Sequence, residues 1–316
     1  MKFLALLMML LLEQIRPLRA GNAVHAGYAQ VAQVLRQVWD AGQTRHGVMA
    51  WVVAVAPLTL LVLVADGLLT RISGVLAVLI SAGVLYVTVG FRRFSNYFNE
   101  INGLLKSGEV AMARAQLQLW RNADCSALDS NAVARVAIEL GLMSSHRYVF
   151  GPVAWFLLLG PAGAMLYRTA ALLHEHWCAR VAPDTGLSDE FAQFSARAFE
   201  VIDWLPARLT AASFAAVGNF QDAVDCWRAQ ASRWKDASQG IILASGAGAL
   251  GVKLGGDLQH ASHETEGAAA DQLRPDLGTG DDADADYLSS AVGLIWRALV
   301  LWMLLAGVVT IAHSLG

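Results

Sequence analysis

The sequence is poor in charged residues and in cysteine, and each shortage narrows the class of protein. Only 16% of the 316 residues are charged, against about a quarter in an average soluble domain, and 56% are hydrophobic. The formal net charge of -3 gives no reason to expect nucleic acid as a partner. The three cysteines, Cys125, Cys178 and Cys226, lie far apart and form no C-x-x-C pair. A disulfide scaffold, a thiol redox motif and a structural zinc site are therefore not expected.

The apolar residues are gathered into long blocks, as in proteins that cross a membrane. A span needs about 20 predominantly apolar residues, and five blocks approach this length: 48–69, 72–91, 149–173, 201–217 and 292–312. Only Thr70 and Arg71 separate the first two blocks, which predicts a tight helical hairpin. The third block is interrupted by two Gly-Pro pairs, at 151–152 and 160–161. We therefore expect an all-α, polytopic membrane protein whose surroundings are a lipid bilayer.

The apolar N-terminus is too short to span unaided. Residues 1–12 read MKFLALLMMLLL and resemble a signal peptide, with Lys2 before an apolar core. However, Glu13, Arg16 and Arg19 follow at once, where a cleavage site needs small uncharged residues. The sequence therefore favours a retained, partly inserted helix over a cleaved signal, within an N-terminal segment that ends at residue 47.

The lysines and arginines of the connecting segments predict the orientation. Cytoplasmic loops carry an excess of these residues, and segment 174–199 has only Arg180 and Arg197. Segment 92–148 has many more: Arg92, Arg93, Lys106, Arg114, Arg121, Arg135 and Arg147. We therefore expect a multi-pass protein of the bacterial inner membrane, with its main loops, 92–148 and 218–291, in the cytoplasm.

Segment 92–148 is expected to be a helical subdomain. Apolar residues recur at helical spacing over 94–105, a second helix is predicted over 109–121, and Asp129 or Ser130 can cap a third over 131–140. No alternating pattern suggests a sheet. Residues 255–290 are rich in Gly, Ala and Asp, which predicts a mobile cytoplasmic loop. Its four clustered aspartates do not have the spacing of a calcium loop.

Charged side chains in or beside the apolar blocks are the first candidates for a site, because they normally need a partner or a function there. Arg168, Asp203, Arg208 and Lys253 are consistent with a basic pocket for a phosphate or carboxylate. The alternative is that the arginines only anchor helix ends. His174 and His176 point to opposite sides of a helix and lack a third ligand, so no metal site is predicted. The glycines of 246–256 suit either a ligand or close helix packing.

Five segments, in this order, resemble the CobD/CbiB family. They are Gly108-Glu-Val-x-x-Ala-Arg, Gly160-Pro-Ala-Gly-Ala-Met-Leu-Tyr-Arg168, Asp203-Trp-Leu-Pro-Ala-Arg-Leu-Thr210, Gly248-Ala-Leu-Gly-Val-Lys-Leu-Gly-Gly256 and Arg274-Pro-x-Leu-Gly278. The resemblance covers about residues 108–300 and implies a membrane enzyme of cobalamin biosynthesis. That family joins aminopropanol, or its phosphate, to adenosylcobyric acid through an amide bond.

The resemblance also implies site residues. Glu139 and Asp124 match acidic family positions and are the predicted catalytic residues. The predicted substrate-binding residues are Arg168, Asp203, Arg208, Lys253, Gly255, Gly256 and Arg274. The implied ligand is a corrinoid or an amino-alcohol phosphate. No cofactor is firmly predicted, and Mg²⁺ is considered only for an active enzyme.

The sequence departs from that family pattern at several places. In the family, acidic and amide residues occupy five positions that differ here. These positions hold Met143, Ser144, Arg147, Ala171 and His174 in this sequence. The N-terminus and Arg147 are instead similar to AmpE proteins of the same superfamily. That resemblance implies the alternative function, a non-enzymatic membrane sensor or regulator of cell-wall signalling and β-lactamase induction.

Overall fold

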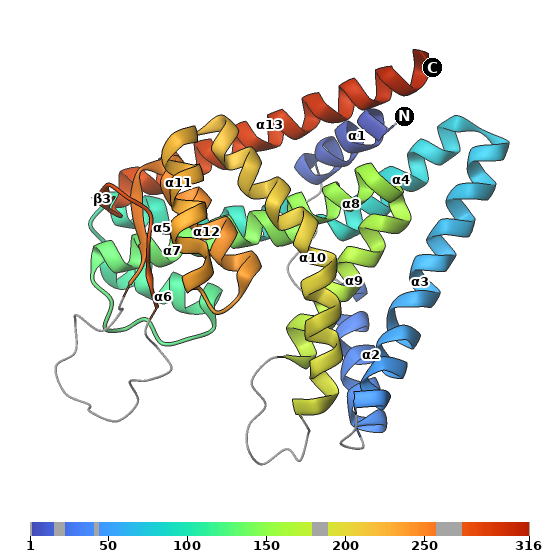
Figure 1. Ribbon diagram of the computed structural model, residues 1–316, viewed down its shortest axis with the longest axis horizontal. Coiled ribbons are helices and arrows are strands. Elements are labelled where there is room, and N and C mark those ends of the chain that lie inside the picture. The colour runs from blue at the N-terminus through green and yellow to red at the C-terminus, as the bar shows by residue number, and fades with distance from the viewer. Residues whose placement is uncertain (1, 16–22, 41–43, 179–188, 257–273, 316) are drawn as a thin grey trace. The chain divides into compact units, whose positions relative to one another are not determined.

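The computed structural model describes residues 2–15, 23–40, 44–178, 189–256 and 274–315, and these are almost entirely helical (Figure 1). The chain forms two compact units. Unit 1 comprises Met1–Gly90, Arg147–Pro206 and Met303–Gly316, and unit 2 comprises Phe91–His146 and Ala207–Trp302. The all-α prediction is confirmed, with one small sheet added in unit 2.

The described secondary-structure elements of unit 1 are all helices. They are α1 (Lys2–Ile15), α2 (Ala23–Trp39), α3 (Thr44–Ile72), α4 (Gly74–Thr88), α8 (Gly151–Leu159), α9 (Pro161–Trp177), and parts of α10 (Asp189–Val217) and α13 (Ala285–Leu315). Consecutive α3 and α4 pack against each other. The break lies at Ser73 and not at Thr70 and Arg71, because the Ser73 hydroxyl accepts the Val75 N–H at 3.3 Å and caps α4.

The two Gly-Pro pairs of the third apolar block behave differently. At Gly160 the backbone takes a positive φ of 71°, which ends α8, and Pro161 begins α9. At Gly151 the chain continues without a break from a five-residue π-helix (His146–Phe150) into α8. Only the second pair therefore interrupts the helix.

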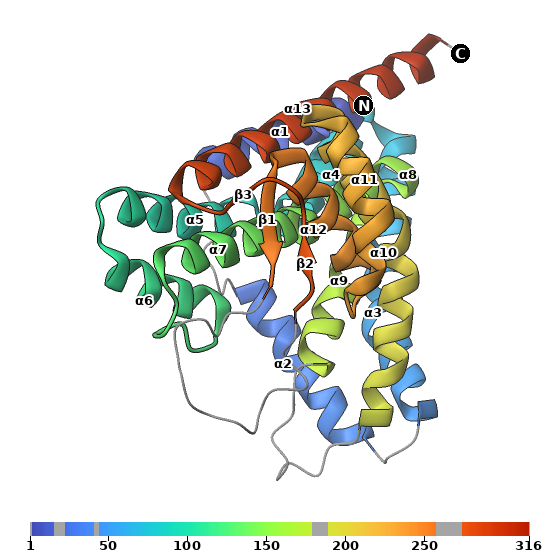
Figure 2. The ribbon, with the colours of Figure 1, turned by 60° about the vertical axis from the view of Figure 1, so that its left-hand side comes forward.

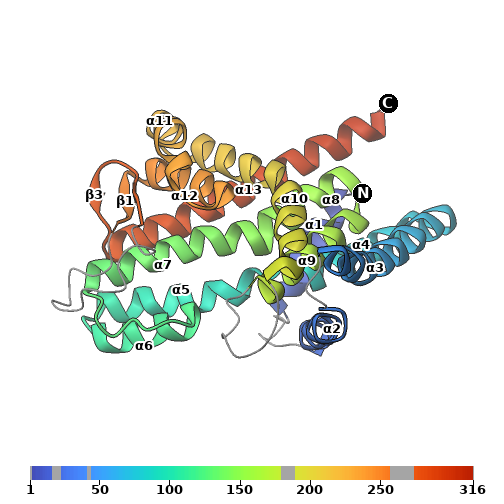
Figure 3. The same cartoon turned by 60° about the horizontal axis from the view of Figure 1, so that its bottom comes forward.

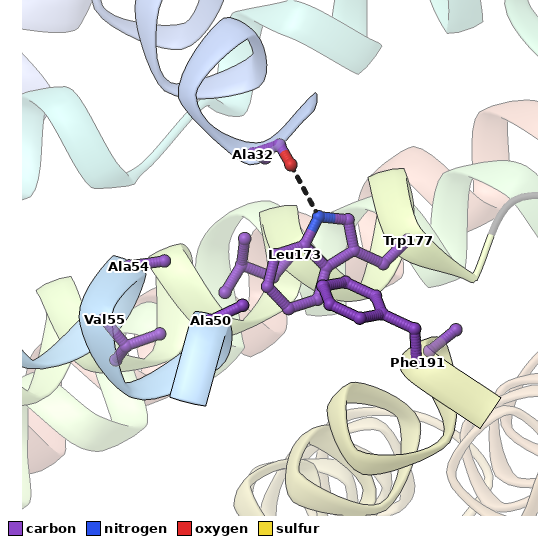
Figure 4. Close-up of a cluster of buried hydrophobic side chains, with 8 residues drawn as sticks. Ala32, Ala50, Ala54, Val55, Leu173, Trp177 and Phe191 are labelled. Atoms are coloured by element: carbon purple, nitrogen blue, oxygen red, sulfur yellow. Dashed lines mark hydrogen bonds between the residues drawn. The ribbon is translucent and has the colours of Figure 1, made fainter. Parts of the chain in front are cut away.

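A buried hydrophobic cluster of unit 1 joins α2, α3, α9 and α10 (Figure 4). The Trp177 ring meets Phe191 edge-on, with 4.9 Å between the centroids. Its indole N–H donates to the carbonyl of Ala32 at 2.8 Å, so this buried donor is satisfied. Around the two rings lie small and branched side chains: Ala32, Ala50, Ala54, Val55 and Leu173. A side chain at Gly47 would come within 2.4 Å of the Phe191 carbonyl, so this glycine lets α3 approach α10.

Most of segment 92–148, for which a helical subdomain is predicted, belongs to unit 2 and is helical. Helices α5 (Phe91–Lys106), α6 (Val110–Arg121) and α7 (Ser130–Ser145) lie side by side (Figure 3). Asp129 is the cap of α7, since its Oδ1 accepts the Ala132 N–H at 2.7 Å. Unit 2 also holds α11 (Phe220–Gln230), a 3-10 turn (Ala231–Arg233), α12 (Ala237–Leu250) and the remaining parts of α10 and α13.

A small sheet, absent from the sequence-based expectation, lies beside α12 (Figure 2). Its order is β2 (Asp276–Leu277), β1 (Val252–Gly255), β3 (Asp281–Asp282). Strand β1 is antiparallel to β2 and parallel to β3. Strands of two to four residues are too short to show an alternating pattern, which is why periodicity missed them.

Residues 274–290 differ from the predicted mobile loop, while residues 257–273 of that prediction lie outside the described residues. Two clustered aspartates are in β3, and Asp284 begins α13 by accepting the backbone N–H groups of Asp286 and Tyr287 at 2.9 and 3.0 Å. The Tyr287 hydroxyl donates to Asp281 at 3.1 Å. The acidic run therefore forms a helix cap and a turn, and these contacts order it.

Among the residues that the structure describes, two helices are long and apolar enough to cross a membrane: Thr44–Ile72 and Ala285–Ala312. Only 17% of the most apolar 18-residue window of the first is buried, so most of its apolar surface faces outward. Helices α4 and α12 are apolar but shorter. Spans through the blocks at 72–91, 149–173 and 201–217 stay predictions.

Candidate functional site

The first group of sequence-predicted residues meets in unit 2, around Glu139. This carboxylate projects from the buried face of α7 and is only 7% exposed. Its Oε1 accepts the Gly255 N–H at 2.7 Å, and its Oε2 forms an ion pair with the Arg274 guanidinium. That guanidinium lies over the Trp234 ring, 5.6 Å from the centroid. We name Glu139, Trp234, Gly255, Gly256 and Arg274 the Glu139 cluster.

The two glycines of this cluster have positive φ angles, 73° at Gly255 and 70° at Gly256, which side chains rarely adopt. A Cβ at Gly255 would meet the Pro275 carbonyl oxygen at 2.1 Å. At Gly256 it would meet Asp276 Oδ1 at 2.6 Å and Arg135 Nη1 at 3.3 Å. The chain therefore turns tightly beside Pro275, Asp276 and Arg135, and glycine is required at both positions.

The chemistry that this cluster suits is the recognition of an anion. A guanidinium presents a planar set of N–H donors that matches a carboxylate or phosphate. Arg274 is held on one side by Glu139 and on the ring face by Trp234, so part of its rotational freedom is already lost before a ligand arrives. Lys253 is exposed and pairs with Asp282 at 3.8 Å, away from the buried side of β1.

The glycines of α12 pack against other helices. A Cβ at Gly246 would meet Leu142 Cδ1 of α7 at 2.7 Å. At Gly248 it would meet the Asp222 carbonyl oxygen of α11 at 2.4 Å. Of the two interpretations of 246–256, a ligand site or close helix packing, packing therefore explains Gly246 and Gly248. Gly255 and Gly256 form the tight turn of the Glu139 cluster.

A second group of buried polar residues lies in unit 1. The Tyr167 hydroxyl donates to Asp203 Oδ1 at 2.7 Å, and both side chains are buried. Arg147 and Glu175 pair at 3.6 Å. The remaining members are Arg168 and Tyr148, with the guanidinium 4.7 Å from the ring centroid. We name these six residues the Asp203 cluster.

Two charged or titratable side chains of unit 1, Arg147 and His174, contact one aromatic ring. The Arg147 guanidinium lies 5.7 Å from the Phe199 ring centroid, and the His174 ring stacks on the same ring at 4.9 Å. Sequence reasoning missed Tyr148, Tyr167 and Glu175 as members of a site. Tyr167 and Glu175 stand directly beside the flagged Arg168 and His174, which was the available signal.

Asp203 and Arg208 lie on one helix but belong to different units. Helix α10 has Pro206 in its interior, and the boundary between the units follows this residue. In the unit 2 part, Thr210 Oγ1 lies 2.9 Å from His146 Nδ1, and both side chains are buried. The last residue of the 203–210 motif therefore ties α10 to the end of α7.

Asp124, the second predicted acid, is exposed in a turn. Its two carboxylate oxygens accept the Ser126 N–H at 3.0 Å and the Ser126 hydroxyl at 3.1 Å. These hydrogen bonds hold the pKa of Asp124 below its usual range. No hydrogen bond or ion pair links Asp124 to the Glu139 cluster within the described part of the chain.

No group of three or more His, Cys, Asp or Glu side chains that could hold a metal ion occurs among the described residues. The paired oxygens of Glu139 and Asp124 already have protein donors.

The sequence profile of the CobD/Cbib protein family matches residues 5–310, nearly the whole chain. The chain belongs to this family. A cobalamin biosynthesis protein CobD of Stutzerimonas stutzeri (strain A1501) is 33% identical over 308 residues, which cover 96% of each chain. One from Chromobacterium violaceum is 33% identical over 292 residues, 91% of this chain and 86% of the relative. No solved structure matches.

The family match extends beyond the segments that first suggested it. The resemblance was expected to cover about residues 108–300, whereas the match begins at residue 5 and includes the apolar N-terminus. A more distant relative, a probable cobalamin biosynthesis protein CobD of Methanothermobacter thermautotrophicus, is 25% identical over 213 residues, 66% of this chain and 69% of the relative. The family match and the named relatives thus identify the chain as a cobalamin biosynthesis protein of the CobD/Cbib family.

Proposed function

We propose that this chain joins an amino alcohol, or its phosphate, to a carboxyl group of a corrinoid through an amide bond. Its family and its relatives named as cobalamin biosynthesis proteins support this reaction class. The amine nitrogen attacks the carboxyl carbon, the C–O bond to the leaving group breaks, and the amine loses a proton to a base. A free carboxylate is a poor acceptor, so a nucleoside triphosphate would activate it as an acyl phosphate and the leaving group would be phosphate. Mg²⁺ would accompany that triphosphate.

The observation that carries the proposal is the position of Arg274. It belongs to the Arg-Pro-x-Leu-Gly segment, it is held by Glu139 and Trp234, and it lies beside the Gly255–Gly256 turn. An amino-alcohol phosphate and a corrinoid carboxylate are both anions that such a guanidinium can bind. We assign Arg274, Gly255 and Gly256 to anion binding. Lys253 and Arg208 are further substrate-binding cations of unit 2. Arg168 and Asp203 are the substrate-binding residues of the Asp203 cluster in unit 1.

In this proposal Glu139 positions Arg274 and the glycine turn. Its two oxygens already accept from the Gly255 N–H and the Arg274 guanidinium, and proton transfer through Glu139 would break these contacts. The predicted role of Glu139 as general acid or base, like that of Asp124, stays a prediction.

The second candidate function is a sensor or regulator without catalysis, as in the AmpE resemblance. The occupied oxygens of Glu139 and Asp124 favour it, since neither predicted acid is presented to a substrate as a lone carboxylate. The same anion site would then bind a ligand without turning it over.

The proposed location is the bacterial inner membrane, with several spans and the main loops in the cytoplasm. The two long apolar helices and the excess of lysine and arginine in segment 92–148 support this location. The substrates named above are cytoplasmic in this arrangement.

The test is complementation of a bacterial strain that lacks its own cobinamide synthase, grown where growth depends on new cobalamin. The wild-type chain is expected to restore growth, Arg274→Ala to abolish it, and the exposed Arg233→Ala, the matched control, to restore it. In membranes supplied with the corrinoid acid, the amino-alcohol phosphate and the triphosphate, Arg274→Ala should lower kcat/KM by about 10- to 150-fold, the value of one charged hydrogen-bonded contact. No growth with the wild-type chain present in the membrane would overturn the enzyme proposal and favour the regulator.

A further inference from the structure

A pocket of about 350 Å³ lies in unit 1, apart from both clusters described above. Its polar lining includes Lys2 of α1, Asp66 and Thr70 of α3, and Ser81 of α4. The walls are otherwise largely apolar, with Phe156 of α8 and Val309 of α13 among them. The pocket therefore places a cation and an anion in an apolar cavity.

Several contacts fix the pocket's walls. The Lys2 ammonium donates to the Leu157 carbonyl oxygen at 2.6 Å, and the Phe3 N–H donates to Thr310 Oγ1 at 3.2 Å, so α1 is tied to α8 and α13. The Thr70 hydroxyl donates to the Asp66 carbonyl oxygen at 2.6 Å. The Lys2 ammonium has three N–H donors, and only one is used by Leu157.

The helices around the pocket expose apolar side chains on their outer surfaces. Examples on four of them are Leu4 (55% exposed), Leu68 (55%), Val75 (70%) and Leu304 (63%). Such an extended apolar surface is rare on soluble monomers and is typical of contact with lipid. A pocket that opens between these helices therefore meets lipid molecules first.

The depth of the charged residues fits a lipid headgroup. Asp66 lies six residues before the end of α3 at Ile72, about 9 Å along the helix axis. The headgroup region on each side of a bilayer is about 5–8 Å thick. Asp66 therefore lies near the level where headgroup meets acyl chain when α3 spans the membrane.

We propose that this pocket binds a zwitterionic phospholipid with a primary amine, of the phosphatidylethanolamine class. The lipid phosphate lies at Lys2, its ammonium group lies at Asp66 and Thr70, and its acyl chains follow the apolar walls. An anionic headgroup matches Lys2 but is repelled by Asp66. A trimethylated amine has no N–H to donate to the carboxylate. The inference rests on the proposed membrane location and is independent of the proposed reaction.

The test uses the full chain, purified from membranes in detergent and mixed with phosphatidylethanolamine, phosphatidylglycerol or phosphatidylcholine. Native mass spectrometry measures lipid occupancy, and thermal unfolding measures stabilisation. We expect phosphatidylethanolamine to bind at least about 10-fold more tightly than the other two and to raise Tm. Asp66→Asn and Lys2→Gln should each weaken its binding by about 10-fold, the effect of about 1.4 kcal/mol.

Glu190→Gln is the matched control, because Glu190 is exposed on α10 of unit 1 and does not line the pocket. It should bind phosphatidylethanolamine like the wild type. Equal binding of the three lipids, or unchanged binding by both pocket variants, would overturn the proposal. Failure of the enzyme assay with normal lipid binding would leave the lipid site standing, so the two proposals fail separately.

Discussion

At the scale of single residues, Cys178 connects burial with a measurable pH dependence. It lies at the C-terminal end of α9, with Sγ 3.7 Å from the Ala192 carbonyl oxygen. Burial raises the pKa of its thiol from 9.0 to about 11, and the Arg36 guanidinium opposes this rise. Because the folded-state pKa exceeds the unfolded one, the stability that the neutral thiol provides is present below pH 9 and is lost as the pH rises toward 11.

We expect iodoacetamide to alkylate Cys178 about 100-fold more slowly at pH 8 than a thiol of pKa 9, since only the thiolate reacts. The rate should increase about tenfold per pH unit up to pH 11. Peptide mass spectrometry after timed alkylation of the folded chain gives the rate at this cysteine alone. A rate that levels off near pH 9 would contradict the assigned burial.

The hydrogen bond from Tyr167 to Asp203 gives a second residue-scale prediction. Tyr167→Phe leaves a buried carboxylate without one of its donors, which costs about 1–3 kcal/mol. We expect Tm in detergent to fall by several degrees. Tyr97→Phe is the control, since the Tyr97 ring stacks on Trp120 at 5.9 Å and this contact survives the change. Equal Tm values for the two variants would show that the Tyr167 hydroxyl has no stabilising role.

At the scale of elements, the glycines of α12 make a graded series. Gly248→Ala places its Cβ 2.4 Å from the backbone of α11, which can yield only if that helix moves. Gly246→Ala meets the movable end of the Leu142 side chain at 2.7 Å. Overpacking costs about 1–3 kcal/mol, so we expect Gly248→Ala to lower Tm clearly and Gly246→Ala to lower it less.

Gly293→Ala in α13 is the control for this series, because no atom lies within 4 Å of its added Cβ. Alanine is favoured over glycine in a helix by up to about 1 kcal/mol, so Tm should stay the same or rise. The reverse order, with Gly246→Ala as the more damaging change, would contradict the packing of α12 on α11.

The elements differ in how far the sequence could predict them. Helices α5, α6 and α7 were predictable because their apolar spacing, the break at Gly108 and the cap at Asp129 are local signals. The β1–β2–β3 sheet was not, since its strands are stabilised by pairing between segments and not by their own pattern. The sequence likewise predicts a mobile loop for the acidic run at 281–286, because the contacts of Asp281 and Asp284 that order it form only in the folded chain.

At the scale of the whole molecule, the candidate site depends on contacts between distant parts of the chain. Glu139 and Arg274 were each flagged by family resemblance, but their ion pair joins residues 135 positions apart, which no local pattern encodes. The charged residues of the apolar blocks, Arg168 and Asp203, were predictable as members of a site. The contact between Tyr148 and Glu175 was not predictable, because only folding brings the π-helix at His146–Phe150 and the end of α9 together.

The last prediction concerns the orientation in the membrane. Two single-cysteine substitutions test it. Gln118→Cys replaces an exposed residue of α6 in segment 92–148, and Glu190→Cys replaces an exposed residue in segment 174–199. Because the native Cys125 and Cys226 are buried and Cys178 is partly so, the introduced thiols should dominate labelling by a membrane-impermeant maleimide. The charge bias predicts that the maleimide labels Glu190→Cys in intact spheroplasts, and that it labels Gln118→Cys only after lysis.

The wild-type chain, labelled in parallel, corrects for the labelling of Cys178. Labelling of Gln118→Cys in intact spheroplasts would place the Glu139 cluster's segment outside the cell, where no corrinoid acid or triphosphate is supplied, and would count against the proposed orientation and reaction together.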